Sequence, residues 1–190
     1  MKVFFIRHGQ TTANVEKIYA GQMDVTLTPE GQAQAKALAP ILGKIAFDRV
    51  YSSDLSRAMD TAKLALPGCR LHTTALLREY DVGYVLGRKF GDFPPELEKE
   101  YLLTKNYALF GGESTQTVCD RVRQFQRILE QESLENVAVF AHNGTLNCML
   151  RNVLGEVDMG GLYNKNCAIN VFEYDGKRWR VLALNYMSEV

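Results

Sequence analysis

The sequence lacks long hydrophobic segments and has no excess of charge of either sign. Its first apolar run, from Val3 to Ile6, ends at Arg7. A membrane-spanning helix needs about 18 apolar residues, and a signal peptide needs an apolar region of about 7 to 15. Lys and Arg number 22, as do Asp and Glu, so no net charge attracts nucleic acid. We therefore expect a cytoplasmic protein that binds neither membranes nor nucleic acids.

The chain also lacks several signatures of metal, redox and phosphoryl-transfer sites. The four cysteines, at positions 69, 119, 148 and 167, form no C-x-x-C pair, and none is followed six positions later by arginine. This argues against zinc knuckles, thioredoxin-like sites and cysteine phosphatases. Neither a G-x-x-x-x-G-K-[ST] motif nor a two-metal His/Asp cluster occurs. We expect buried free thiols, no metal and no cofactor.

The chain does contain enough apolar residues to build one core. Of its 190 residues, 46% are hydrophobic, which suits one domain spanning residues 1–190 better than two domains. Apolar, β-branched runs predict central strands at 2–7, 48–52 and 136–141. Amphipathic spacing, capping residues and terminating glycines predict helices at about 28–43, 53–67 and 144–154, a short helix opened by Pro94-Pro95, and a longer helix after Gly112.

The order of these elements predicts the fold class. Residues 71–77 are ambiguous, whereas 169–174 and 179–184, joined through Asp175-Gly176, predict an antiparallel hairpin with a type I′ turn. Because the other strands alternate with helices, we expect a three-layer α/β/α sandwich. Its central sheet should be mostly parallel and carry this antiparallel hairpin at one edge. Such sheets bind ligands beyond the carboxyl ends of their strands.

Two histidines and two arginines occur at these strand ends. Arg7 and His8 follow the first strand, Arg57 follows the second, and His142 follows the strand before the 144–154 helix. A phosphoryl group in transfer spreads negative charge over three oxygens, so fixed cations and N–H donors can stabilise it without a metal. A histidine nucleophile needs one ring nitrogen held by an acceptor, commonly a backbone carbonyl, and Gly9 lets the chain turn sharply enough to offer one. The pattern therefore favours phosphoryl transfer.

Phosphoryl transfer also needs an acid to protonate the leaving oxygen. Glu79, in Leu77-Arg78-Glu79, is the best-placed carboxylate, while Asp81 and Glu113 are alternatives. Asn14 is a further hydrogen-bond donor beside the first strand.

Structural roles are the alternative interpretation for several of these residues. Arg57 could instead pair with Asp54 or Asp60 on a helix surface. His72 is not accompanied by other candidate catalytic residues, so we expect a surface or structural role for it. An aromatic-rich insertion at about 88–113 could be a substrate lid or a cover for the core. Its aromatic residues are Phe90, Phe93, Tyr101, Tyr107 and Phe110.

An ordered set of motifs along nearly the whole chain resembles one protein family. In order, the set is Arg7-His8-Gly9-Gln10-Thr11, Asn14, residues 21–28, residues 52–58, Leu77-Arg78-Glu79, Gly112-Glu113-Ser114 and Ala141-His142-Asn143-Gly144. It resembles the histidine phosphatase superfamily, also called phosphoglycerate-mutase-like. Arg-His-Gly alone would be a weak signal, but the ordered set is specific.

The resemblance implies a role for each site residue. His8 would be the nucleophile that becomes phosphohistidine, and Glu79 would act as acid and then as base. Arg7, Arg57 and His142 would hold the phosphate of a small phosphorylated metabolite. Hydrogen bonds would come from Asn14 and from the backbone near Gly21. The remaining predicted substrate-binding residues are Gly9, Gln10, Thr11, Gln22 and Asn143.

Two departures from the family pattern bear on the substrate. Asn143 stands where many members have glycine or serine, and residues 83–87 replace an acidic or Trp-containing stretch. The first departure is minor, whereas the second leaves the identity of the substrate open.

The resemblance implies metal-independent hydrolysis of a phosphomonoester, with three alternatives. A cofactor-dependent phosphoglycerate mutase needs extra cations for its carboxylate substrate, but the only basic residues between Glu79 and Glu113 are Arg88, Lys89, Lys99 and Lys105, without an Arg-Arg pair. A catalytically inactive phosphate-binding module would be expected to lack His8 or Glu79. A phosphatase acting on protein phosphohistidine would need an open site, which the aromatic insertion disfavours.

Overall fold

A computed structural model describes residues 1–92, 95–104, 106–155 and 163–186. Its strands form one six-stranded sheet in the order β3-β2-β4-β1-β5-β6. The strands are β1 (Lys2–Arg7), β2 (Arg49–Ser53), β3 (Leu71–Thr74), β4 (Asn136–Ala141), β5 (Ile169–Tyr174) and β6 (Trp179–Tyr186). The pairs β3–β2, β2–β4 and β4–β1 are parallel, whereas β5 is antiparallel to both β1 and β6. The expected mostly parallel sheet with an antiparallel edge is confirmed.

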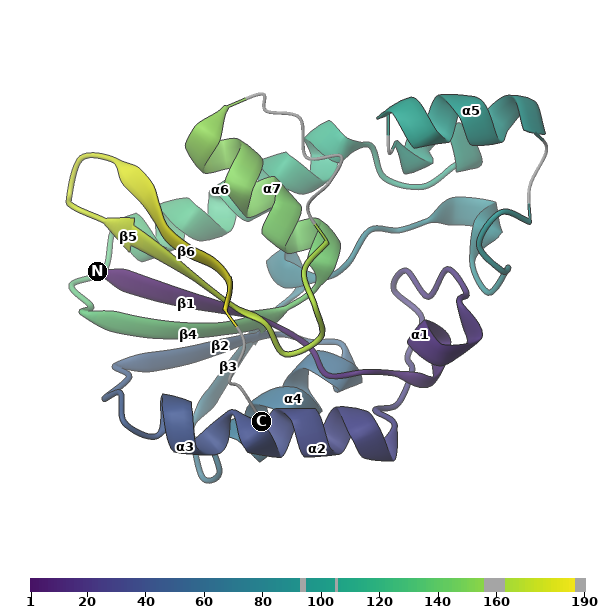
Figure 1. Cartoon of the computed structure of the whole chain (residues 1–190). Helices are drawn as coiled ribbons and strands as arrows, with labels where there is room; N and C mark the ends of the chain where they lie inside the picture. The colour runs from purple at the N-terminus through teal and green to yellow at the C-terminus, as the bar shows by residue number, and fades with distance from the viewer. Residues whose placement is uncertain (93–94, 105, 156–162, 187–190) are drawn as a thin grey trace.

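Helices cover both faces of this sheet (Figure 1). On one face lie α2 (Pro29–Ala37), α3 (Ala39–Leu42) and α4 (Ser56–Ala65), and on the other lie α6 (Thr115–Glu130) and α7 (Asn143–Leu154). The short α1 (Thr12–Glu16) and α5 (Pro95–Thr104) lie at the end of the sheet where β1 and β4 finish. No helix of the described residues is long and apolar enough to cross a membrane.

Strand β4 shows why the central strands are apolar without alternation. Val137, Val139 and Ala141 belong to the core cluster that includes the apolar face of α6, while Ala138 and Phe140 belong to the cluster with α2 and α4. All five side chains are fully buried. A strand with helices on both faces buries both sets of alternate side chains, so polar residues have no exposed face to occupy.

Three predicted elements differ from the observed ones. The helix expected over 28–43 breaks at Leu38 into α2 and α3, because Pro40 has no N–H to donate and its ring would clash with the carbonyl of Lys36. Helix α4 begins at Ser56, without a side-chain cap from Ser53 or Asp54. The ambiguous segment forms β3 followed by a 3₁₀ helix over Ala75–Leu77.

The turn between β5 and β6 was also predicted wrongly. Four residues, 175–178, join the strands in place of a two-residue type I′ turn. Asp175 Oδ1 accepts hydrogen bonds from the N–H groups of Lys177 (3.0 Å) and Arg178 (2.9 Å). The carboxylate thus stabilises a wider loop, in which Gly176 has a positive φ of 90°.

The aromatic insertion largely covers the core. Phe110 is 1% exposed and belongs to the core cluster, and Tyr101 and Tyr107 pack against that cluster. Phe90 is 56% exposed but contacts Tyr19, with 4.7 Å between the ring centroids. Phe93, with Pro94 of the predicted short helix, lies outside the described residues.

Candidate active site

His8 lies directly beyond β1, with its main chain fixed on both sides. Its N–H donates to the carbonyl of Ala141 (3.0 Å), and its own carbonyl accepts from Asn166 Nδ2 (3.0 Å). The imidazole Nδ1 lies 2.8 Å from the carbonyl oxygen of Gly9. Since a carbonyl can only accept, Nδ1 carries the hydrogen and Nε2 keeps its lone pair. The backbone carbonyl that was expected to hold the ring is therefore that of Gly9 itself.

The surroundings of His8 keep its ring neutral. The side chain is buried, and burial, followed by the charges of Arg57 and Arg7, holds its pKa well below the usual value of 6.5. The Gly9 hydrogen bond opposes this shift without overcoming it. A neutral imidazole with an unprotonated Nε2 is the form that can act as a nucleophile.

Arg57 is held by backbone carbonyls in the first turn of α4. Its guanidinium donates to Gly21 O (2.7 Å) and Met23 O (2.9 Å), and the residue is 2% exposed. Burial lowers the pKa of Arg57 to about 10, against the opposing charges of Glu79 and Asp24, so the guanidinium remains protonated at neutral pH.

The alternative that Arg57 pairs on the helix surface is wrong. The residues that were candidate partners pair elsewhere, Asp54 with Arg78 and Asp60 with Lys63. Gly21, expected to offer backbone hydrogen bonds to phosphate, uses its carbonyl to orient Arg57.

Arg7 and His142 complete a buried polar cluster around His8. Arg7 donates from Nη1 to the carbonyl of Asn164, and its guanidinium carbon lies 4.9 Å from the centroid of the Tyr163 ring. The His8 and His142 ring centroids are 5.2 Å apart. Within the described part of the chain, Arg7 Nε and both ring nitrogens of His142 are buried without a hydrogen-bond partner. Buried polar atoms without a partner are costly in a folded protein. An anion bound beside Arg7 and Arg57 would accept hydrogen bonds from Arg7 Nε and from the ring nitrogen of His142 that carries a hydrogen.

Burial and cationic neighbours also keep His142 neutral. Burial has the largest effect, followed by the charges of Arg57, His8 and Arg7, and together they hold its pKa well below 6.5. Among the described residues, no group of three or more His, Cys, Asp or Glu side chains is arranged to hold a metal ion.

Glu79 reaches the site from the segment that follows the Ala75–Leu77 3₁₀ helix. Its Oε2 accepts from the N–H of Gly144 (3.1 Å), in the first turn of α7, and Oε1 accepts from the N–H of Tyr80 (3.0 Å). A Cβ on Gly144 would lie 2.5 Å from carbons of the Tyr80 ring and still closer to Glu79. Glycine at position 144 therefore allows the carboxylate to reach this N–H.

The two alternative acids are engaged elsewhere. Asp81 is exposed, and its Oδ1 accepts from the N–H of Gly83 (2.9 Å). Glu113 forms an ion pair with Arg121 (3.0 Å). Burial raises the pKa of Glu113, but hydrogen bonds from Arg121 and Asp81 outweigh burial and lower it overall. An ionised, paired Glu113 is a poor proton donor, so the geometry favours Glu79.

Several predicted substrate-binding side chains contact other protein groups. Thr11 and Asn14 form a reciprocal capping box at α1. Gln10 Oε1 accepts from Thr28 Oγ1 (2.8 Å) at the start of α2. Gln22 Nε2 donates to the carbonyl of Glu79 (3.2 Å). Asn143 Oδ1 accepts from Asn164 Nδ2 (3.1 Å). These contacts support the loops that carry Arg7, His8 and Glu79.

Sequence reasoning missed the loop before β5 and one arginine of α6. Asn164 accepts from Arg7 through its carbonyl, Asn166 holds the carbonyl of His8, and Tyr163 stacks on Arg7. The asparagines at 164 and 166 were the available signal, because asparagine favours loops with special hydrogen bonding. Arg121, which contacts the Glu79 segment, gave no signal within an ordinary amphipathic helix.

Comparisons with known proteins show which proteins this chain resembles. A sequence model described as histidine phosphatase superfamily (branch 1) matches residues 3–187. The protein named "Probable phosphoglycerate mutase GpmB" of Salmonella paratyphi A is 29% identical in an alignment of 188 residues. The alignment covers 94% of this chain and 87% of that protein.

Solved structures of two phosphatases are similar along their whole length. Mycobacterial glucosyl-3-phosphoglycerate phosphatase, solved in complex with VO3, is 28% identical, with a TM-score of 0.87, 97% of this chain covered and 98% of that chain. The α-ribazole phosphatase of Shigella flexneri is 26% identical, with a TM-score of 0.81 and coverage of 98% and 96%.

Proposed function

Since this chain belongs to the histidine phosphatase superfamily, we propose that it is a metal-independent phosphatase that hydrolyses a small phosphorylated metabolite through a phosphohistidine on His8. The observation that carries the proposal is the environment of the His8 imidazole. Its Nδ1 is held by Gly9, and it is buried beside Arg7 and Arg57. Two arginines in a buried site can supply the fixed positive charge that phosphoryl transfer requires.

The proposed reaction has two steps. In the first, His8 Nε2 forms a bond to phosphorus while the bond to the ester oxygen breaks, and that oxygen takes a proton from Glu79. In the second, Glu79 removes a proton from a water molecule that attacks the phosphohistidine, which releases inorganic phosphate and restores His8. Arg7, Arg57 and His142 stabilise the charge on the equatorial oxygens in both steps.

Phosphatase activity is favoured over mutase activity by the exposure of the basic residues that follow Glu79 in the chain. Arg88 stacks over the exposed Tyr84, 5.9 Å from its ring centroid, and Arg88, Lys89 and Lys99 are all exposed. Lys105 lies outside the described residues. The phosphatase names of structural relatives support the same reaction class, whereas the mutase name of the Salmonella relative makes isomerisation the competing outcome.

The test is a panel of phosphomonoesters assayed in excess chelator. The panel holds p-nitrophenyl phosphate, phosphoserine, 3-phosphoglycerate, glucosyl-3-phosphoglycerate, α-ribazole phosphate and nucleoside monophosphates. We expect release of inorganic phosphate from at least one of them without added metal. A strict requirement for a divalent cation contradicts the proposal, as does conversion of 3-phosphoglycerate to 2-phosphoglycerate without phosphate release.

A further inference from the structure

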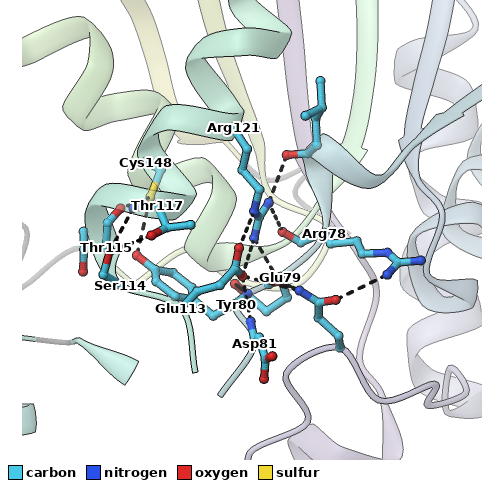
Figure 2. Close-up of polar contacts among 12 residues, drawn as sticks. Arg78, Glu79, Tyr80, Asp81, Glu113, Ser114, Thr115, Thr117, Arg121 and Cys148 are labelled. Carbon is cyan, nitrogen blue, oxygen red and sulfur yellow. Dashed lines mark hydrogen bonds and ion pairs between the residues drawn. The ribbon is translucent and has the colours of Figure 1, made fainter. Parts of the chain in front are cut away.

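The segment that carries Glu79 has little regular secondary structure to hold it. Residues 78–82 run between two 3₁₀ helices, Ala75–Leu77 and Gly83–Val85. The carbonyls of Leu76, Arg78 and Glu79 all accept hydrogen bonds from the guanidinium of Arg121, at 2.9, 2.6 and 3.0 Å. Figure 2 shows this side chain extending from α6 into the curve of the segment. One side chain therefore replaces the backbone ladder that a strand or helix would supply.

Glu113 fixes the orientation of that guanidinium and binds the other side of the same segment. Its two carboxylate oxygens each lie 3.0 Å from a nitrogen of Arg121, one from Nε and one from Nη2. Glu113 Oε2 also accepts from the N–H of Asp81 (2.8 Å), and the N–H of Glu113 donates to the carbonyl of Asp81 (2.8 Å). The pair thus holds the backbone on both sides of Glu79.

The Arg121–Glu113 pair is largely buried and is connected to the loop that holds Arg57. The side chains of Arg121 and Glu113 are 13% and 20% exposed. Gln22 donates from Nε2 to the carbonyl of Glu79 (3.2 Å) and to Glu113 Oε2 (3.4 Å). The residue before it, Gly21, accepts from Arg57. The backbone of the acid segment and the Arg57 guanidinium are therefore held by neighbouring residues of one loop.

We propose that Arg121, oriented by Glu113, is a positioning residue that sets the distance between Glu79 and the leaving oxygen. This inference rests on the proposed function, in which Glu79 is the acid. A displacement of about 1 Å can cost two orders of magnitude in rate. Lysine at position 121 would keep the charge, but a single ammonium cannot reproduce a planar fork that serves three carbonyls and a carboxylate.

The test compares Arg121→Lys with Arg123→Lys on two aryl phosphates of similar shape. Arg123 lies two residues further along α6 and donates to the carbonyl of Asn152 (2.7 Å), away from Glu79, so Arg123→Lys is the matched control. Phenolate is a far poorer leaving group than p-nitrophenolate and depends more on an acid. The measured quantity is kcat/KM, because it reports on steps up to the first P–O cleavage.

We expect Arg121→Lys to lower kcat/KM about 10- to 100-fold for phenyl phosphate and less than about threefold for p-nitrophenyl phosphate. Arg123→Lys should change neither value more than about twofold. Equal losses on both substrates, or no loss on either, overturn the positioning role, because a structural or inert role predicts no dependence on the leaving group.

A second variant keeps the test decisive if Arg121→Lys does not fold, as judged by thermal unfolding. Glu113→Gln retains the shape of the side chain and weakens the orientation of Arg121, so it should give the same substrate dependence with a smaller amplitude. Failure of the unmodified chain to hydrolyse any phosphomonoester of the panel, the two aryl esters included, contradicts the proposed phosphatase function itself. A Glu79→Gln variant without leaving-group dependence overturns the assignment of Glu79 as acid. Both results differ from a failure confined to Arg121 and Glu113.

Discussion

The two halves of the site are held in different ways. In the half proposed to bind phosphate (Arg7, His8, Arg57 and His142; the phosphate half), backbone hydrogen bonds between neighbouring strands and loops fix Arg7 and His8, such as His8 N to Ala141 O. In the half that carries Glu79, the proposed acid (the acid half), side chains of Arg121, Glu113 and Gln22 fix the backbone around Glu79. The first arrangement belongs to the sheet itself, whereas the second depends on a few particular side chains. The acid half should therefore respond more to single substitutions outside the reacting groups.

The largest expected effect lies in the phosphate half. His8→Ala removes the proposed nucleophile, and the neighbouring His142 is proposed to hold the phosphate and not to attack it, so kcat should fall at least about 10³-fold. Rapid quenching of the unmodified enzyme during turnover should trap a base-stable, acid-labile phosphoenzyme that the variant lacks. His72→Ala, on β3, is the control and should retain activity. A phosphoryl group found on serine or cysteine in place of histidine would contradict the assignment.

The next effect tests the acid half at its reacting group. Glu79→Gln cannot donate a proton, so kcat/KM for phenyl phosphate should fall about 10²-fold or more, and that for p-nitrophenyl phosphate much less. Because the ionised carboxylate is also proposed to activate water, the variant should accumulate phosphoenzyme with the nitrophenyl ester. Equal losses and no accumulation would assign the acid to another residue, and Asp81→Asn would then be measured.

A smaller effect is the pH dependence of the free energy of unfolding, which should come from the two buried histidines of the phosphate half. Burial and nearby arginines lower the pKa values of His8 and His142, so below about pH 6.5 the unfolded state binds protons that the folded state does not. The free energy of unfolding should then fall with decreasing pH by at most about 1.4 kcal/mol per pH unit for each histidine, and this stability is fully present well above pH 6.5.

The variant His142→Asn isolates this contribution. Urea unfolding between about pH 6.5 and 5.5 should show a slope shallower than that of the unmodified protein by about 1 kcal/mol per pH unit. The difference between the two slopes removes the contribution of carboxylates that both proteins share. Identical slopes would show that His142 titrates normally in the folded state.

The smallest effect is expected for a neighbouring ion pair in the acid half. Arg78 binds Asp54 at 2.6 Å, but its side chain is 40% exposed, and pairs so exposed contribute at most about 1 kcal/mol. Asp54→Asn should therefore lower the free energy of unfolding by less than about 1 kcal/mol and leave kcat/KM within about twofold. A loss as large as that of Arg121→Lys would show that the Arg78 side chain also holds the segment.

This contrast explains which features the sequence predicted. Arg7, His8, Arg57 and His142 follow strands or begin helices, so recognising the elements brings these residues to one edge of the sheet. Arg121 lies on the polar side of a helix whose apolar residues give an ordinary pattern, and nothing local distinguishes it from an exposed arginine. Its partners are carbonyls some 40 residues away in the chain, a separation that periodicity does not report.

Local chemistry misled the sequence analysis where tertiary contacts competed. Ser53 and Asp54 looked like helix caps, but Ser53 Oγ accepts from the N–H of Leu55 (3.3 Å) and Asp54 pairs with Arg78. Asp175-Gly176 resembled a two-residue turn, whereas the Asp175 side chain supports a four-residue loop. In both cases a carboxylate found partners other than the ones its sequence position suggested.

The loop after β1 meets α2 through two glycines, and this limits what a mutational scan of the site can reveal. A Cβ on Gly9 would lie 2.5 Å from the carbonyl oxygen of Gly31, and a Cβ on Gly31 would collide with the carbonyl of Gln10. Backbone on backbone leaves no flexible side chain to move aside. Inactive variants at either glycine would thus indicate that the backbone contact between the loop after β1 and α2 is disrupted, even though neither residue takes part in chemistry through a side chain. Invariance of both positions across a library would be a signature of packing that mimics a signature of catalysis.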